Sequence, residues 1–323
     1  MRIDEIDQFS ATLLHDALVE TDCLPGRRSG KVRDLYREGD RLAIVSTDRL
    51  SAFDRPVTSI PLKGRILNLL SAWWFAETSP ILGNHLLSVP HPNVTIARAC
   101  EPLPLEFVVR GYLTGSTSTS LWTHYREGRR EYCGHRLPDG LRKNDPLPEP
   151  IVTPTTKDAD GDEPISGDEA VRRGLIDAPT WERASAAALE LFRFGSGVAA
   201  DAGYVLADTK YEMGTGPGGT LLLVDEIHTP DSSRFWKAAS LPGRLARGEE
   251  PESADKEFLR LWFADRCDPY RDEELPAAPD ELRLELTRRY FTLYSALTGG
   301  HEIPFDPAEG PEAIDRAVNE GLG

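Results

Sequence analysis

A run of glycines near the middle of the chain separates two segments of strand composition, and this feature constrains the fold most. Residues 204–213 and 220–227 are rich in β-favouring side chains and flank the segment 214–219, whose sequence is GTGPGG. A dinucleotide-binding fingerprint also clusters glycines, but it requires a helix after them, and residues 220–224 have strand composition. The pattern therefore predicts a β-hairpin whose turn is the glycine run.

The first strand of this hairpin carries charges at alternate positions. Asp208, Lys210 and Glu212 share one face, because alternate residues of a strand point the same way. Three charges on one face of an apolar strand are costly unless they are engaged. Asp225 and Glu226 follow the second strand, and we expect one of them to project to each side. Glu212 and Asp225 are predicted to converge on one Mg²⁺, and a purely structural ion-pair network is the open alternative.

The rest of the chain mixes strands and helices without the regular alternation of a doubly wound sheet. Residues 138–167 are dense in Pro, Asp and Gly and are predicted to form a long ordered loop, after which Ser166 and Glu169 form a capping box. The expected elements are a hairpin at 32–36 and 41–47, strands within 94–110, and helices at 65–77, 180–202, 254–265 and 280–298.

These elements predict an α+β fold with two lobes. Residues 1–115 are expected to form a β-rich N-terminal lobe that carries a phosphate-binding flap. Residues 116–323 are expected to form an α+β lobe that carries the glycine hairpin and an acidic helical tail.

Charge and composition exclude several classes of protein. The 323 residues include 37 Lys and Arg against 53 Asp and Glu, a net charge of −16, which argues against a general nucleic-acid binder. We find no apolar run of roughly 18 residues and no basic, apolar leader, so we expect a cytoplasmic protein without membrane contact. The four cysteines form no C-x-x-C pair and predict neither a zinc site nor a disulfide framework.

Several loops have compositions that suit anions. Gly30 and Lys31 precede a strand and are typical of a flap over nucleotide phosphates, although an exposed basic turn would have the same composition. Each of the stretches 46–54, 110–116 and 229–234 follows a strand and combines an arginine with hydroxyl groups. Together with the segment TPTTK at 153–157, they predict a site for more than one anion, although each alone could be a capped turn.

The segments 103–116 and 206–214 resemble the two signature segments of the SAICAR synthetase family (phosphoribosylaminoimidazole-succinocarboxamide synthase). Residues 30–34, 46–54, 153–157 and 225–234 resemble further blocks of this family in the same order, so the resemblance covers about 25–265. It is strongest to the longer single-chain form. Met213 stands where the signature usually has Phe, which is an apolar substitution of similar volume.

The resemblance implies a two-lobed ATP-binding fold with antiparallel sheets and flanking helices. It also implies a ligase of de novo purine synthesis that joins L-aspartate to the carboxylate of carboxyaminoimidazole ribotide (CAIR), with ATP and Mg²⁺, through an acyl phosphate. The products are SAICAR, ADP and phosphate. The implied partners are these small molecules, without nucleic acid or membrane, in a monomer or small homo-oligomer.

The resemblance also implies roles for individual residues. The residues implied to be catalytic are Lys210, Asp225 and Arg110. The implied ATP-binding residues are Lys31, Arg33, Lys157, Lys210 and Glu212, and the implied metal ligands are Glu212 and Asp225. The implied substrate-binding residues are Asp48, Arg49 and Ser51 on the aspartate side, and Arg110, Ser116, Asp208, Ser232, Ser233 and Arg234 around the ribotide.

Two other functions remain open at this point. One is a different ATP-dependent carboxylate–amine ligase or a small-molecule kinase on a similar scaffold. The other is a nucleotide-binding module without activity, which would not need both Glu212 and Asp225.

Overall fold

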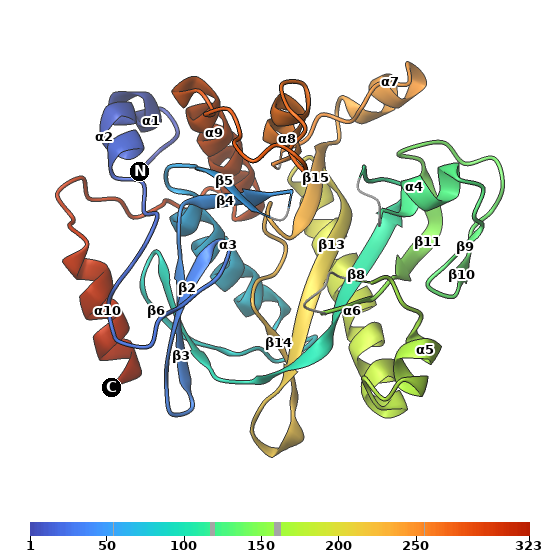
Figure 1. The fold of residues 1–323 in the computed structure, drawn as a ribbon, viewed down its shortest axis with the longest axis horizontal. Helices are drawn as coiled ribbons and strands as arrows, with labels where there is room; N and C mark the ends of the chain where they lie inside the picture. The colour runs from blue at the N-terminus through green and yellow to red at the C-terminus, as the bar shows by residue number, and fades with distance from the viewer. Residues whose placement is uncertain (54, 117–119, 158–162, 255) are drawn as a thin grey trace.

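Two large antiparallel sheets lie side by side with helices around them (Figure 1), and two further sheets, β4–β5 and β9–β10, have two strands each. This computed structural model describes residues 1–53, 55–116, 120–157, 163–254 and 256–323. Mixed helices and antiparallel strands confirm the α+β class. No helix within these ranges is long and apolar enough to cross a membrane.

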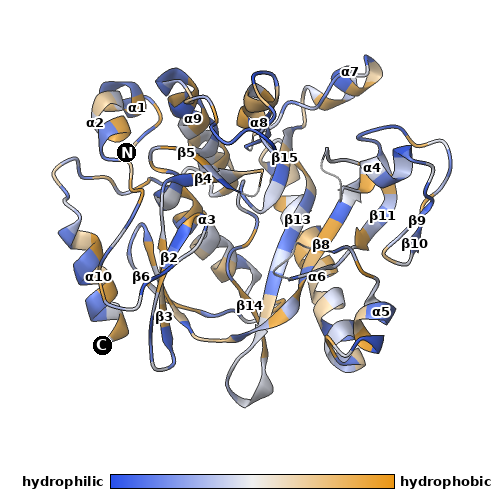
Figure 2. Ribbon diagram, viewed as in Figure 1, coloured by the Kyte–Doolittle hydropathy of each residue, from blue (hydrophilic) through white to orange (hydrophobic). Residues whose placement is uncertain are grey.

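The first sheet contains the expected N-terminal hairpin. Its strand order is β1 (Arg28–Ser29), β2 (Arg33–Glu38), β3 (Arg41–Ser46), β7 (Val94–Arg98) and β6 (Leu86–His91). Helix α3 (Lys63–Thr78) packs on one face, where Asn68 hydrogen-bonds Thr95 at 2.8 Å. Helix α10 (Glu312–Leu322) packs on the other face, where its apolar residues join a core cluster with Val45 and Ile96. Figure 2 shows how hydrophilic and hydrophobic residues alternate along α10.

The second sheet is built around the predicted glycine hairpin. Its strand order is β11 (Pro146–Val152), β8 (Glu101–Tyr112), β13 (Tyr204–Thr215) and β14 (Leu221–Val224), with β12 (Thr155–Thr156) paired to β8 and β15 (Ser233–Lys237) paired to β13. Glu212 lies opposite Val224, so the hairpin prediction is confirmed. Helix α6 (Ala178–Asp201) covers β8, β11 and β13.

The two sheets meet at β14. The backbone N–H of Leu223 donates to the Gly83 carbonyl at 2.9 Å, and the N–H of His85 donates to the Leu223 carbonyl at 3.1 Å. This contact places the residues that follow β14 beside the start of β2. Along the chain, the last strand of the first sheet is β7, and β8 belongs to the second sheet. The predicted lobe boundary at residue 115 lies after β8 and so groups this strand with the N-terminal lobe.

The remaining elements surround this frame. Helices α1 (Glu5–Gln8) and α2 (Ser10–His15) precede the first sheet, and α2 contacts α9 (Asp280–Leu297), which also packs on α3 and α8 (Glu257–Ala264). The shorter elements are β4 (Arg49–Ala52), β5 (Arg55–Ser59), α4 (Leu121–Arg126), β9 (Glu131–Tyr132), β10 (His135–Arg136), α5 (Gly167–Arg172), a 3₁₀ turn (Pro217–Gly219) and α7 (Leu241–Ala246).

The prediction of a continuous loop over 138–167 is wrong. Strands β11 and β12 lie within this range and pair with β8. Prolines at 146, 148 and 150 suggested a loop, but proline is tolerated in an edge strand because an edge residue can spare its N–H group, and β11 is the edge strand of its sheet. The N-cap half of the predicted capping box is confirmed, because Ser166 Oγ accepts the Glu169 N–H at 3.2 Å and opens α5, whereas the Glu169 carboxylate pairs with Arg172 and Arg173.

Candidate active site

The charged face of β13 meets a matching face of β8. Lys210 donates to Glu212 Oε1 at 2.6 Å and to Glu106 Oε1 at 2.9 Å, and Glu106 lies opposite Glu212 in the strand register. Lys157, which follows β12, forms a second ion pair with Glu212. The prediction that Asp208, Lys210 and Glu212 share an engaged face is confirmed by these contacts and by the pairing of Asp208 with Arg110.

Electrostatics keep this group charged. Burial opposes the charge on Lys210, but the surrounding carboxylates, chiefly Glu212, outweigh it and raise the pKa of Lys210 above its usual range. Burial likewise opposes ionisation of Glu212, but Lys210 and Lys157 hold the pKa of that carboxyl below its usual range. Both partners are therefore ionised at neutral pH. The contacts of Lys210, Glu212, Glu106 and Lys157 form an ion-pair network, which was the alternative to a Mg²⁺ site.

A second charged group forms at the corner after β14. Arg33, the first residue of β2, forms an ion pair with Asp225 and a second with Glu226 at 2.8 Å. Burial opposes the charge on Arg33, yet these two carboxylates raise its pKa above the ordinary value. Glu226 also accepts the Thr229 hydroxyl at 2.6 Å. The corner thus joins the first sheet to the second.

The expectation that Asp225 and Glu226 project to opposite sides is wrong. Asp225 adopts a positive φ of 68°, so the strand's alternation ends at Val224 and both carboxylates contact Arg33. Aspartate is one of the residues that tolerates this left-handed conformation. The same change ends the second strand of the hairpin before residue 227.

Glu212 and Asp225 have the donor chemistry that suits Mg²⁺. Both contribute to the electrostatic environment of Lys210, which places them around one region. The described residues contain no group of three or more His, Cys, Asp or Glu side chains arranged to hold a metal. Mg²⁺ commonly takes one or two carboxylates and completes its shell with phosphate oxygens and water, so a pair of carboxylates fits it.

Arginines from β8 and β15 converge on Asp208. Arg110 reaches Asp208 at 3.4 Å and donates from Nε to Thr153 Oγ1 at 2.9 Å, while Arg234 pairs with the same Asp208 oxygen. The strand register explains this convergence, because Asp208 lies opposite Arg110 on one side and opposite Arg234 on the other. Ser233 hydrogen-bonds Thr209 at 2.7 Å, and Ser232 hydrogen-bonds Thr229 at the preceding turn.

A cavity of about 230 Å³ lies next to this arginine pair. It is lined by Arg234 and Ser116, two residues that the resemblance implies to bind the ribotide, and also by Lys143 and Arg289, which sequence reasoning did not single out. Lys143 forms an ion pair with Glu250 at 2.5 Å. It belongs to the stretch that we predicted to be a loop. The chain has only seven lysines, so each one is a candidate for a specific role, and this scarcity is the signal that could have pointed to Lys143.

The base of the predicted flap is fixed by Arg49. Its guanidinium donates to the carbonyls of Gly30 and Lys31 and forms an ion pair with Asp34 at 2.9 Å. Gly30 closes a tight turn through an N–H bond to the Arg33 carbonyl at 2.7 Å. Lys31 is exposed, whereas the Arg33 side chain is turned inward to the Asp225–Glu226 corner.

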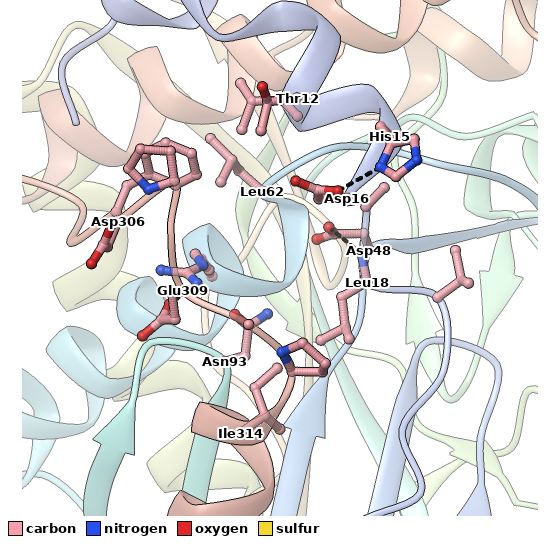
Figure 3. A pocket seen from close by; sticks show the side chains of 18 of the residues that line it. Thr12, His15, Asp16, Leu18, Asp48, Leu62, Asn93, Asp306, Glu309 and Ile314 are labelled. Carbon is pink, nitrogen blue, oxygen red and sulfur yellow. Dashed lines mark hydrogen bonds and ion pairs between the residues drawn. The ribbon is translucent and has the colours of Figure 1, made fainter.

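Asp48 lies away from these charged groups. Its carboxylate accepts the backbone N–H groups of Leu18 at 2.9 Å and Gly64 at 2.8 Å, and burial raises its pKa to about 6. It lines a separate cavity of about 500 Å³, in which Glu309 lies across from it (Figure 3). Asp48 and Arg49 are thus engaged in holding chain segments together. Ser51 is half-buried on β4.

Comparison with known proteins identifies relatives over most of the chain. The family model described as SAICAR synthetase matches residues 27–276. A phosphoribosylaminoimidazole-succinocarboxamide synthase from Legionella pneumophila (strain Paris) is 54% identical over 295 residues, which are 91% of this chain and 94% of that protein. A chloroplastic synthase of the same name from Arabidopsis thaliana is 53% identical over 96% of this chain and 77% of its own length.

Solved structures agree with these relatives. The SAICAR synthase of Saccharomyces cerevisiae in complex with SAICAR superimposes with a TM-score of 0.76 at 32% identity, covering 88% of this chain and 99% of that one. A SAICAR synthetase in complex with ADP superimposes with a TM-score of 0.65 at 25% identity, covering 87% of this chain and 100% of that one.

Proposed function

Because the chain belongs to the SAICAR synthetase family, we propose that its two charged groups, on β13 and at the Asp225–Glu226 corner, form the centre at which CAIR is activated and then joined to aspartate. The protein is an ATP-dependent ligase that joins L-aspartate to CAIR in purine biosynthesis. The single observation that carries the location is that Lys210, which pairs with Glu212, also lies in the electrostatic field of Asp225, the partner of Arg33.

The ATP phosphates would lie against the β13 group. Lys210 and Lys157 supply cations there, and Lys31 supplies one from the exposed turn before β2. Glu212 and Asp225 would hold Mg²⁺, which neutralises phosphate charge when bound. Arg33 meets the same corner from β2, so movement of the flap and rearrangement of the corner would be linked.

The ribotide would lie beside the arginine pair. Arg110 and Arg234 present forked guanidinium groups that suit phosphate and carboxylate. Asp208, Ser232 and Ser233 add acceptors and hydroxyls, and Ser116 reaches the adjoining cavity. This arrangement would hold the CAIR carboxylate toward the ATP side of β13, because the same strand carries Asp208 and Lys210.

The chemistry would proceed in two steps. A carboxylate oxygen of CAIR attacks the γ-phosphorus of ATP, and the bond from that phosphorus to ADP breaks. The aspartate amine then attacks the acyl carbon, the carbon–oxygen bond to phosphate breaks, and the amine loses a proton. The protein's contribution to both steps is to position anions and to stabilise developing negative charge.

An omission experiment tests this function. Purified protein is supplied with ATP, Mg²⁺, CAIR and L-aspartate, and each component is left out in turn while SAICAR, ADP and phosphate are measured. We expect SAICAR only in the complete mixture and equal yields of SAICAR and phosphate. ADP release with CAIR alone at full rate would favour a kinase, and binding of ATP without turnover in any mixture would favour a nucleotide-binding module.

Trapping would test the acyl phosphate. With CAIR and ATP but no aspartate, hydroxylamine should convert the activated carboxylate to a hydroxamate, and ADP should form in equal amount. Absence of the hydroxamate in an enzyme that makes SAICAR would contradict the intermediate. The cytoplasmic location, the monomer or small homo-oligomer and the lobe division at residue 115 stay predictions.

A further inference from the structure

Two lysines meet a buried aspartate of the loop that joins β14 to β15. Asp231 of that loop contacts Lys63 Nζ at 2.8 Å and Lys256 Nζ at 3.8 Å, and it accepts the Tyr290 hydroxyl at 3.1 Å. Lys63 begins α3, Lys256 is the N-cap residue of α8, Asp231 lies in the loop and Tyr290 lies on α9. We call Lys63, Asp231 and Lys256 the lysine cluster.

The lysine cluster has one more cation than its carboxylate can neutralise. Burial opposes ionisation of Asp231, but the two lysines outweigh it and hold its pKa well below the usual range. Asp231 is therefore ionised, and Lys63 and Lys256 share its carboxylate. Two of the chain's seven lysines are thus placed around a single carboxylate, in a region where buried charges are normally paired and hydrogen-bonded.

Lys256 is the less well satisfied of the two lysines. Over the ranges that the structure describes, its ammonium makes one ion pair, at 3.8 Å, and no hydrogen bond, although an ammonium has three donors. Its side chain is 16% exposed, against 2% for Lys63. Burial lowers the pKa of Lys256, Asp231 partly offsets this, and Arg260 and Lys63 lower it further. An additional carboxylate would satisfy this group.

The lysine cluster adjoins the proposed reaction centre. Its loop begins at the Asp225–Glu226 corner, and Thr229 of the loop donates to Glu226. The Ser232 carbonyl, one residue after Asp231, accepts the backbone N–H of Lys210 at 2.9 Å. Glu226 also contributes to the electrostatic environment of Lys256. A ligand held by Lys256 would therefore lie close to both charged groups.

The other substrates already have their cations. Lys210, Lys157 and Lys31 serve ATP in the proposed function, and Arg110 and Arg234 serve CAIR. For the carboxylates of aspartate the resemblance implies Arg49, whose guanidinium is engaged by backbone carbonyls and by Asp34, while Lys143 and Arg289 line the cavity on the ribotide side. The amine of aspartate must also reach the acyl carbon of CAIR, so its two carboxylates have to be bound away from that carbon.

We propose that Lys256 binds a carboxylate of L-aspartate, while Asp231 and Lys63 hold the Lys256 ammonium in place. This inference rests on the proposed function and adds the subsite for the amino acid. It makes Lys256 a specificity residue, since an amine without a carboxylate at the corresponding position would leave the ammonium unsatisfied.

Steady-state kinetics of Lys256→Met and Lys256→Gln test the proposal. Loss of a charge-assisted hydrogen bond should raise the KM for aspartate about 10- to 100-fold. The KM values for CAIR and ATP should change by less than about twofold. Lys256→Arg, which keeps the charge, should recover part of the affinity for aspartate. Lys237→Met is the matched control, because Lys237 pairs with Glu252 on the surface at 2.6 Å.

The possible outcomes separate this proposal from the proposed function. If the wild-type protein makes no SAICAR, the proposed function fails and the subsite fails with it. If the wild type is active and a folded Lys256 variant keeps the KM for aspartate, or loses affinity for all three substrates equally, the subsite alone is overturned. Two neutral variants are used so that one unfolded protein, recognised by its circular dichroism, does not decide the result.

Discussion

Replacing Lys210 by methionine separates the structural role of this lysine from its proposed catalytic role. Lys210 bridges Glu212 at 2.6 Å and Glu106 at 2.9 Å. Methionine keeps most of the volume but removes the charge, so the two glutamates face each other directly across β13 and β8. Like charges opposite one another destabilise a sheet.

The expected cost follows from the exposure of these side chains. Breaking a fully buried ion pair costs about 3–5 kcal/mol. The three side chains are 15–29% exposed, and Lys157 still neutralises Glu212, so we expect a loss of about 1–3 kcal/mol at pH 7. Because the pKa of Glu212 is held below 4.5, the stability from this pair is present above that pH and is lost in acid. The difference between variant and wild type should therefore shrink as the pH falls.

Turnover should respond differently from stability. Loss of a cation that stabilises transferring phosphate should lower the rate of SAICAR formation at least about 100-fold. Adding Glu106→Gln removes one of the opposed charges, so the double variant should regain much of the stability. It should remain inactive, because no cation has returned.

Urea unfolding and SAICAR formation are measured on wild type, both single variants and the double variant. A double variant that recovers both stability and turnover would show that Lys210 only neutralises glutamate, and would refute the catalytic role. A Lys210→Met protein as stable as wild type at pH 7 would refute the electrostatic reasoning.

Three further predictions concern other groups. Asp225→Asn should abolish SAICAR formation while the protein stays folded, because Arg33 keeps its pair with Glu226; near wild-type turnover at saturating Mg²⁺ would contradict the metal role. Arg110→Lys loses the fork that links Asp208 and Thr153 and should weaken CAIR binding much more than ATP binding, measured as separate KM values; equal losses would count against the assignment. Burial lowers the pKa of His85 from 6.5 to about 4, so neutral His85 contributes stability above pH 6.5 that is lost as the pH falls toward 4. The unfolding free energy of His85→Gln should fall less steeply than that of the wild type between pH 6.5 and 4. Parallel curves of unfolding free energy against pH for the two proteins would contradict this.

Local patterns predicted the elements whose signals are local. The alternation of Asp208, Lys210 and Glu212 predicted a shared face because a strand has a fixed period, and the structure confirms it. The helix at 65–77 and the helix before Gly203 were predicted from apolar periodicity and a C-terminal glycine, and α3 and α6 correspond to them.

Predictions failed where the neighbouring chain decides the outcome. The proline-rich stretch at 146–150 forms an edge strand because β8 offers a partner, which proline composition does not reveal. Asp225 and Glu226 share Arg33 because the backbone turns left-handed at Asp225. The role of Asp48 on the aspartate side stays a prediction, and what composition did not reveal is that its carboxylate binds two backbone N–H groups from segments distant in sequence.

The sequence by itself determined the α+β class, the glycine hairpin, the family resemblance and the identities of the charged residues, because these depend on composition, period and spacing. Only the tertiary structure decided which charges neutralise one another. Arg33 meets Asp225 across 192 positions of sequence because β14 of the second sheet contacts the segment before β6 of the first. Lys63 and Lys256 share Asp231 because the starts of two helices meet at one loop. Coulomb energies depend on distance and burial, and long-range packing sets both.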